Sequence, residues 1–342
     1  MTSLMLEETR AAPERVRTML AGDAGAYTAL AEALRCAPPA FVVTIARGSS
    51  DHAAAYLASL MGIAAGRVTA SLPPSLITRY GAPLAFEGAF VVALSQSGAS
   101  PDLVRALEAA RAGGAITAAI VNQPDSPLAA AAALVLPQLA GPERSVAATK
   151  SVVATLAAAA RLVGSWQQDE TLLAALDRLP ERLEAALACD WSRALDLLAE
   201  ATSLYVVGRG PGLGIAEETA LKLKETSGIL AEALSAAEIQ HGPKAVIGPG
   251  FPVLAYGLAD PGGEDARGFA GELARAGARV MLASPTASPG GGLHLPLPPP
   301  LHPLLDPIPA LLAFYPLAEA LARRRGRDPD RPPGLRKVTR TF

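Results

Sequence analysis

The stretch AFVVALSQSGASPD, residues 89–102, decides the fold class of this chain. Its first six residues are apolar and predict a buried strand. The small polar residues that follow lead into a predicted helix, for which Ser100 is a favourable N-cap and Pro101 a favourable first-turn residue. A strand that passes through a short polar turn into a helix is the repeating unit of a parallel sheet with crossover helices.

The same unit recurs along the chain. In the first half, strands are predicted at 41–46, 116–121 and 133–136, with helices from about 51 and over 145–163. In the second half, a strand at 203–207 leads through Gly208-Arg209-Gly210 into a helix that runs through Ser227, and further strands are expected at 251–256, 279–283 and 293–297. The segments 45–48 (IARG) and 207–210 (VGRG) resemble each other, which indicates an internal duplication.

These patterns predict an α/β protein with two flavodoxin-like halves in tandem. We expect a first domain at 1–168, connector helices and a second domain at 169–324, and a polar tail at 325–342. The connector helices cover about 169–200, and a Gly- and Pro-rich stretch at 285–303 is expected to be irregular.

Composition excludes several functional classes. The net charge is −2 with both signs dispersed, so neither nucleic acid nor an anionic membrane is an expected partner. The acidic first nineteen residues do not resemble a signal peptide, and the longest apolar run, 128–136, falls short of the roughly 20 residues that span a bilayer. Cys36 and Cys189 are far apart and lack metal-type spacing, so a reduced, cytoplasmic environment is expected.

Two clusters of small polar residues follow strands of the first half. Ser49 and Ser50 come after one strand, and Ser95, Gln96, Ser97 and Ser100 come after another. Each cluster precedes a helix, whose first N–H groups suit a phosphate. Either cluster alone reads as an ordinary turn with an N-cap; together, at the carboxyl ends of neighbouring strands, they favour binding of phosphate or sugar hydroxyls.

The glycines at 208–214 offer an alternative, a dinucleotide site. Their spacing is G-x-G-x-G-x-G instead of G-x-G-x-x-G, and no acidic residue stands at a following strand end. The sequence therefore disfavours this alternative.

Acid–base chemistry is indicated by the helix after Gly210. Glu218, Lys222 and Glu225 share one helical face, and His241 follows in a predicted turn. Only five of the 30 basic residues are lysines, and lysine can act as an amine where arginine cannot. A carboxylate, an ammonium and an imidazole near a phosphate site can serve the enolisation of a sugar phosphate. On its own, the helical stripe would read as a solvated salt-bridged face.

Four motifs together carry a family resemblance. They are ALKLKE (220–225) with HGP (241–243), SQSG (95–98), VAATK (146–150) and GLRKVT (334–339). In this order, over nearly the whole chain, they resemble the isomerase half of glucosamine-6-phosphate synthase and hence the double sugar-isomerase (SIS) fold. We do not expect the synthase's amidotransferase domain in a chain of 342 residues, so the sequence looks more like the stand-alone SIS-type glucosamine-6-phosphate deaminases. The segments RGSSDHA (47–53) and PPGLRKVT (332–339) favour the same resemblance.

The resemblance implies a set of roles. Glu225 would shuttle the proton between C1 and C2, His241 would open the pyranose ring, and Lys337 would lie by the open-chain carbonyl and could form a Schiff base. Glu218 and Lys222 would orient these catalytic side chains. Val146 and Ala148 would approach the sugar through their backbone, and the serines and Gln96 would bind phosphate and hydroxyls. The histidine would come from a neighbouring subunit, which implies a homodimer, and the tail would fold over the active site.

The implied reaction converts glucosamine 6-phosphate to fructose 6-phosphate and ammonia, and it is expected to need no metal or cofactor. A galactosamine-6-phosphate deaminase or isomerase, or a deglycase for a glycated amino acid phosphate, would use the same residues. A non-catalytic sugar-phosphate sensor is a further alternative, although this chain keeps Glu225, His241 and Lys337 and carries no added basic module.

Overall fold

A computed structural model describes residues 2–22, 24–287, 290 and 292–337. The described residues form two compact units. The N-terminal unit contains residues 14–143, 150–177 and 336–337, and the C-terminal unit contains 2–13, 144–149 and 178–335. Both units are discontinuous in the sequence, whereas each expected domain is one continuous range of residues. The division into those functional domains stays a prediction.

The N-terminal unit is built on a five-stranded parallel sheet of order β2-β1-β3-β4-β5. Its strands are β1 (Phe41–Ile45), β2 (Thr69–Ser71), β3 (Ala89–Ser95), β4 (Ile116–Val121) and β5 (Leu134–Pro137). This is the flavodoxin-like order, in which the crossover connections leave β1 and β3 in opposite directions along the sheet.

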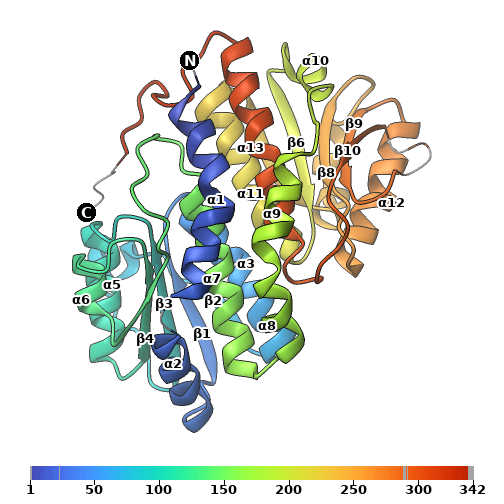
Figure 1. Ribbon diagram of the computed structural model, residues 1–342. Coiled ribbons are helices and arrows are strands. Elements are labelled where there is room, and N and C mark those ends of the chain that lie inside the picture. Colours follow the sequence, from blue (N-terminus) through green and yellow to red (C-terminus); the bar gives the residue numbers. More distant parts are fainter. Residues whose placement is uncertain (1, 23, 288–289, 291, 338–342) are drawn as a thin grey trace. The chain divides into compact units, whose positions relative to one another are not determined.

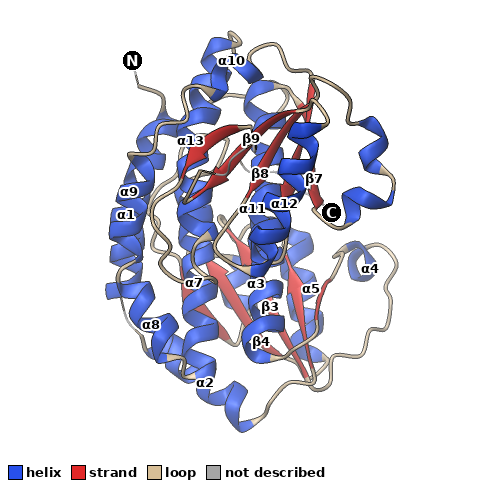
Figure 2. Cartoon of the chain, turned by 90° about the vertical axis from the view of Figure 1, so that its right-hand side faces the viewer, coloured by secondary structure: helices blue, strands red, loops and turns tan. Residues whose placement is uncertain are grey.

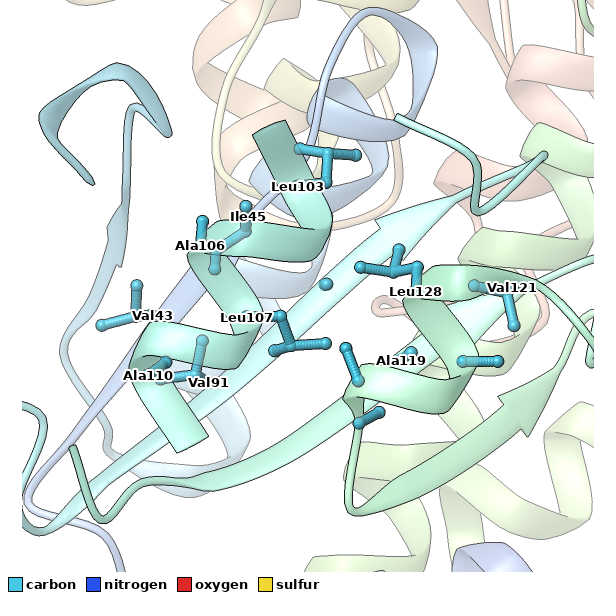
Figure 3. Packing of buried hydrophobic residues seen from close by; sticks show 14 of the residues in the cluster. Val43, Ile45, Val91, Leu103, Ala106, Leu107, Ala110, Ala119, Val121 and Leu128 are labelled. Carbon is cyan, nitrogen blue, oxygen red and sulfur yellow. The ribbon is translucent and has the colours of Figure 1, made fainter. Parts of the chain in front are cut away.

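Helices cover both faces of this sheet (Figure 2). They are α2 (Gly25–Cys36), α3 (Ser49–Ala65), α4 (Ser75–Thr78), α5 (Pro101–Ala112), α6 (Pro127–Ala131), α7 (Lys150–Gln167) and α8 (Glu170–Asp177). On one face, α5 packs Leu103, Ala106, Leu107 and Ala110, at helical spacing, against alternate residues of β1 and β3 (Figure 3). On the other, Phe90 meets Trp166 of α7 edge to face, with ring centroids 6.5 Å apart.

The C-terminal unit repeats the plan with sheet order β10-β9-β8-β6-β7 (Figure 1). Its strands are β6 (Ser203–Gly208), β7 (Leu230–Ser235), β8 (Pro252–Tyr256), β9 (Arg279–Ser284) and β10 (Leu293–Pro296). The helices are α9 (Leu179–Leu187), α10 (Ala194–Leu198), α11 (Pro211–Lys222), α12 (Pro261–Arg275) and α13 (Pro307–Arg324), with a π-helical turn η1 (Leu223–Ser227) and 3₁₀ turns η2 (Glu238–His241) and η3 (Pro243–Val246). Helix α1 (Leu4–Ala21) contains the boundary between the units, after Pro13.

The duplication extends to the backbone of single residues. Gly48, before α3, has φ 53° and ψ −132°; Gly210, before α11, has φ 56° and ψ −132°. Residues other than glycine rarely adopt this backbone conformation. The same offset of 162 residues relates the β1–β3 pair Val43–Val91 to the β6–β8 pair Tyr205–Val253. The expected α/β class, with two tandem parallel sheets, is confirmed.

Several local expectations are wrong. The helix expected over 145–163 begins only at Lys150, so residues 145–149 form an irregular segment. Strands β2 and β7 and helix α13 were not anticipated, and His241 ends a 3₁₀ turn instead of lying in a plain turn. The described part of the tail, 325–337, contains no helix or strand; residues 338–342, including part of the GLRKVT motif, lie outside the described residues. No helix in the described parts of the chain is long and apolar enough to cross a membrane.

Candidate active site

The two polar clusters follow adjacent strands at the topological switch point of the N-terminal sheet. Ser49 and Ser50 begin α3 directly after the β1 turn, and Ser95 to Ser100 connect β3 to α5. Strands β1 and β3 are paired along their length. In open α/β sheets, ligands bind in the crevice at such a switch point, outside the carboxyl ends of the strands. The structure therefore brings the two clusters to neighbouring strand ends, as expected.

The loop after β3 is held by its own side chains. The buried Ser95 accepts a hydrogen bond at its Oγ from the amide of Gly98 at 3.0 Å, and Ser97 Oγ accepts one from the amide of Ala99 at 3.3 Å. A Cβ at Gly98 would lie 2.0 Å from Ser126 Oγ, so only glycine fits there. Ser97 is half-buried. The loop thus presents a partly open hydroxyl on a fixed backbone.

An ion pair connects the two loops. Arg47, just after β1, donates from Nε and Nη2 to Oδ2 of Asp102, on the first turn of α5, at 3.3 and 3.1 Å. Asp102 is 2% exposed, whereas the Arg47 side chain is 49% exposed. In the sequence, Arg47 stands out only as the first residue of the RGSSDHA motif.

The acid–base cluster lies in the C-terminal unit. Lys222 Nζ is 2.6 Å from Glu225 Oε2 and 3.1 Å from Glu218 Oε1. Lys222 and Glu218 are each 1% exposed, but Glu225 is 21% exposed. The prediction that these three residues share a face is confirmed, and the reading as a solvated stripe is wrong because two of them are buried.

The electrostatics of the cluster keep Lys222 charged. Burial by itself lowers the pKa of the Lys222 ammonium, but the charges of Glu218 and Glu225 outweigh it and raise the pKa. Tyr315 of α13 adds a hydrogen bond to Glu218 Oε1 at 3.4 Å. Lys222 is thus a fixed cation that orients Glu225, and it is unsuited to act as a free amine.

Glu225 stands on an irregular turn of its helix. Residues 223–227 form a π-helical turn that continues α11 and ends at Gly228 in the left-handed conformation. Such turns are rare and occur frequently at functional sites. The turn places Glu225 three residues from Lys222 within hydrogen-bonding distance while leaving part of its carboxylate exposed.

The remaining expected catalytic residues, His241 and Lys337, stand on other segments of the chain. His241 is exposed at the end of η2, in the connection from β7 to β8. Lys337 donates to Oε2 of Glu143 at 3.3 Å within the N-terminal unit. The expected position of Lys337 beside Glu225 joins residues of different units and stays a prediction.

The irregular segment 145–149 contains Val146 and Ala148. The backbone bends at residues 145–147, and the Val146 amide donates to the carbonyl of Asp330 at 3.2 Å. Ala148 is half-buried. Their contact with a sugar stays a prediction.

Sequence reasoning missed Glu143. Its carboxylate is buried and accepts from Ser151 as well as from Lys337. A single acidic residue between Pro142 and Arg144 gives no periodic signal in the sequence. Its possible link to the site becomes visible only through the ion pair with Lys337.

Among the glycines at 208–214, Gly208 is required by close packing and Gly210 by its positive φ of 56°. A Cβ at Gly208 would lie 2.3 Å from the carbonyl oxygen of Gly212, so the end of β6 and the start of α11 approach too closely for a side chain. Among the described residues, no group of three or more His, Cys, Asp or Glu side chains is placed to hold a metal ion.

Comparison with known proteins identifies relatives. The SIS domain family model matches residues 34–163 and 197–266. The glutamine–fructose-6-phosphate aminotransferase [isomerizing] of Zymomonas mobilis is 34% identical over 310 residues, which cover 86% of this chain and 51% of that protein. The chain thus spans about half the length of this curated relative.

Solved structures show the same architecture. A protein from Silicibacter pomeroyi DSS-3, provisionally assigned as a phosphosugar isomerase, is 39% identical, with a TM-score of 0.91 over 96% of this chain and all of that one. The glucosamine-6-phosphate deaminase of Thermotoga maritima shares the fold at 21% identity, with a TM-score of 0.74 over 99% of this chain and all of that one. Together with the family match over more than half of its length, these likenesses show that the chain belongs to the SIS domain family.

Proposed function

We propose that this chain deaminates glucosamine 6-phosphate to fructose 6-phosphate and ammonia. The observation that carries the proposal is Glu225, a partly exposed carboxylate fixed at 2.6 Å by a buried ammonium. A positioned carboxylate is the group that a C1/C2 proton transfer needs. The exposed part of this carboxylate is accessible to a substrate.

The proposed sequence of steps balances without a redox partner. His241 assists ring opening, and Glu225 removes the C2 proton of the open-chain aldose while O1 takes up a proton from water, which gives an enolamine. Return of the proton to C1 produces an imine at C2. Water adds to that imine, and the nitrogen leaves as ammonia, so one water is consumed for each ammonia released.

The other site residues bind and orient. Ser49, Ser50, Ser95, Gln96, Ser97 and Ser100 hold the phosphate and sugar hydroxyls, and Val146 and Ala148 contribute backbone contacts. Lys337 lies by the open-chain carbonyl when the tail closes, and Lys222 with Glu218 orients Glu225. The names of two relatives, the isomerizing aminotransferase and the deaminase, both pair a hexose 6-phosphate with amine chemistry, which supports this substrate class.

The deciding experiment supplies the purified chain with glucosamine 6-phosphate, galactosamine 6-phosphate, a glycated amino acid phosphate and fructose 6-phosphate. Ammonia and fructose 6-phosphate should appear in equal amounts from glucosamine 6-phosphate. If ammonia were released from only one of the other amines, that amine would be the substrate. Binding of all four compounds without turnover would indicate a sensor.

A second candidate is aldose–ketose isomerisation without deamination, which the names of the isomerizing aminotransferase and the phosphosugar isomerase favour. Deuterium uptake from heavy water at C1 of fructose 6-phosphate, with no ammonia from any amino sugar, would distinguish it.

We also propose that the working form is a homodimer in which His241 enters the partner's site. The exposure of His241 is compatible with this arrangement. Mixing inactive Glu225→Gln and His241→Ala chains should restore part of the activity, because mixed dimers contain one intact site. No recovery after subunit exchange would place both residues in one chain's site.

A further inference from the structure

The Arg47–Asp102 pair spans the β1/β3 switch point. Arg47 follows the end of β1, and Asp102 is the second residue of the helix that follows β3, so their ion pair links the two segments that carry the serine clusters. Asp102 is buried and fixed further by the amide of Leu103, which donates to its Oδ1 at 2.9 Å. The arginine therefore has a rigid anchor.

The guanidinium keeps capacity for a ligand. A guanidinium has five N–H donors, and the hydrogen bonds to Asp102 are made by Nε and Nη2. About half of the Arg47 side chain is exposed. An arginine held on one edge by a buried carboxylate can present its remaining donors to an oxyanion, for which its planar geometry is well suited.

The duplicated unit contains a natural control. Arg209, 162 residues after Arg47, pairs with Asp265 of α12 at 3.1 Å. That aspartate is 53% exposed, whereas Asp102 is 2% exposed. The C-terminal loop that corresponds to Ser95-Gln96-Ser97 reads Gly257-Leu258-Ala259 and offers no side-chain hydroxyl. Only the N-terminal pair combines a buried anchor with neighbouring polar clusters.

We propose that Arg47 is a specificity-determining residue that binds the phosphate group of the substrate, with Asp102 as its positioning residue. The identity of the ligand as a sugar phosphate rests on the proposed function. The preference for an oxyanion follows from the anchored guanidinium itself.

The test compares Arg47→Ala with the matched control Arg209→Ala in the full chain. Calorimetric titration uses inorganic phosphate, glucosamine 6-phosphate and unphosphorylated glucosamine. A lost charge-assisted hydrogen bond corresponds to about a 10- to 100-fold increase in Kd for the two phosphate ligands. Glucosamine binding should stay unchanged, and Arg209→Ala should bind all three like the wild type. In turnover, KM should rise while kcat changes little, and Arg47→Lys should recover part of the affinity.

Removing Arg47 leaves Asp102 buried without its guanidinium, so the variant could unfold. The double variant Arg47→Ala/Asp102→Asn removes that buried charge and should fold, yet still bind phosphate weakly. If the wild type, the double variant and Arg209→Ala bound phosphate equally well, Arg47 would have only a structural role. The same conclusion would follow if the wild type bound no phosphate. Arg47-dependent phosphate binding without ammonia release would overturn only the proposed function; ammonia release with an unchanged KM in Arg47→Ala would overturn only the role of Arg47.

Discussion

The two units share a backbone plan but differ in what that plan positions. At the offset of 162 residues, Glu218, Lys222 and Glu225 of the C-terminal unit correspond to Tyr56, Leu60 and Ile63 of the N-terminal unit. Tyr56 and Leu60 are fully buried. The same helix position is therefore compatible with an ordinary apolar core.

This difference is informative because buried ion pairs are rarely the most stable choice. Replacing such a pair with apolar residues of similar volume is often neutral or stabilising. The N-terminal unit has uncharged residues, Tyr56 and Leu60, at the positions where the C-terminal unit has the ion pair of Glu218 and Lys222. The contrast is the opposite at the strand ends. There the N-terminal unit has polar side chains, the serines, and the C-terminal unit has the apolar Leu258 and Ala259. One unit thus carries the proposed binding residues and the other the proposed base.

The largest expected effect is on turnover. Glu225→Gln keeps the size of the side chain but removes the proposed base, which should lower kcat about 10²–10⁴-fold while sugar-phosphate binding stays nearly intact. Steady-state ammonia release and calorimetry measure the two effects. Glu232→Gln, an exposed change on β7, is the control. A Glu225→Gln rate above half of the wild type would remove Glu225 from the mechanism.

Lys337→Arg should reduce the rate almost as strongly. Arginine preserves the charge facing Glu143 but cannot supply a free amine. Deleting residues from Pro333 onward should have the same effect on the rate. The change in Tm should be small, because Asp330 still accepts hydrogen bonds from the amides of Leu4 and Met5, and Ser151 still donates two hydrogen bonds to Glu143. Ammonia release and thermal unfolding are measured together. Wild-type rates in either variant would make the tail a structural element only.

Much of the fold follows from periodicity, and the failures have physical reasons. Strand β4 was expected with its observed bounds because its run of six apolar or small residues is buried in the middle of the sheet. Edge strand β7 was missed because its sequence LAEALS has high helix propensity, which pairing with β6 overrides. Helix α13 was missed because of Pro307, Pro309 and Pro316, although the first two stand in the first turn, where proline is tolerated.

The candidate site was predictable only where it is local in sequence. The face of Glu218, Lys222 and Glu225 follows from helical spacing. Its burial does not, because α13 lies against α11 only in the tertiary fold and brings Tyr315 to Glu218. The pairs Arg47–Asp102 and Glu143–Lys337 join residues 55 and 194 positions apart, a separation that no local pattern records.

A stability measurement tests whether the buried cluster is a functional compromise. Lys222→Met leaves Glu218 buried without its cation and should cost about 3–5 kcal/mol of unfolding free energy. The double variant Glu218→Gln/Lys222→Met, which approaches the uncharged arrangement of the N-terminal unit, should recover most of that loss while staying inactive. Urea unfolding measures both. If the double variant were as unstable as the single one, the cluster would be needed for folding and its contrast with Tyr56 and Leu60 would lose its meaning.

Binding should respond at the N-terminal strand ends. Ser97→Ala and Ser49→Ala each remove one proposed donor to the phosphate, which should cost about 1.5–3 kcal/mol of binding free energy. Thr202→Ala, which removes an exposed hydroxyl just before β6, is a control in the other unit. The KM for glucosamine 6-phosphate reports the effect. Unchanged KM values in both serine variants would contradict the proposed cradle.

The smallest expected effect compares the two glycines that begin the first crossover of each unit. Gly48→Ala and Gly210→Ala both place a side chain at φ near +55°, which costs about 1–3 kcal/mol, and neither new Cβ meets an atom closer than 3.9 Å. Backbone strain is then the shared cause, so the two losses of unfolding free energy should agree. Only Gly48→Ala should also weaken phosphate binding, because Ser49 and Ser50 follow Gly48, whereas Pro211 and Gly212 follow Gly210. Chemical denaturation and phosphate titration separate the two effects. Equal stability losses with equal, unaltered phosphate affinity would show that the duplication is structural at both positions and that the β1 turn takes no part in binding.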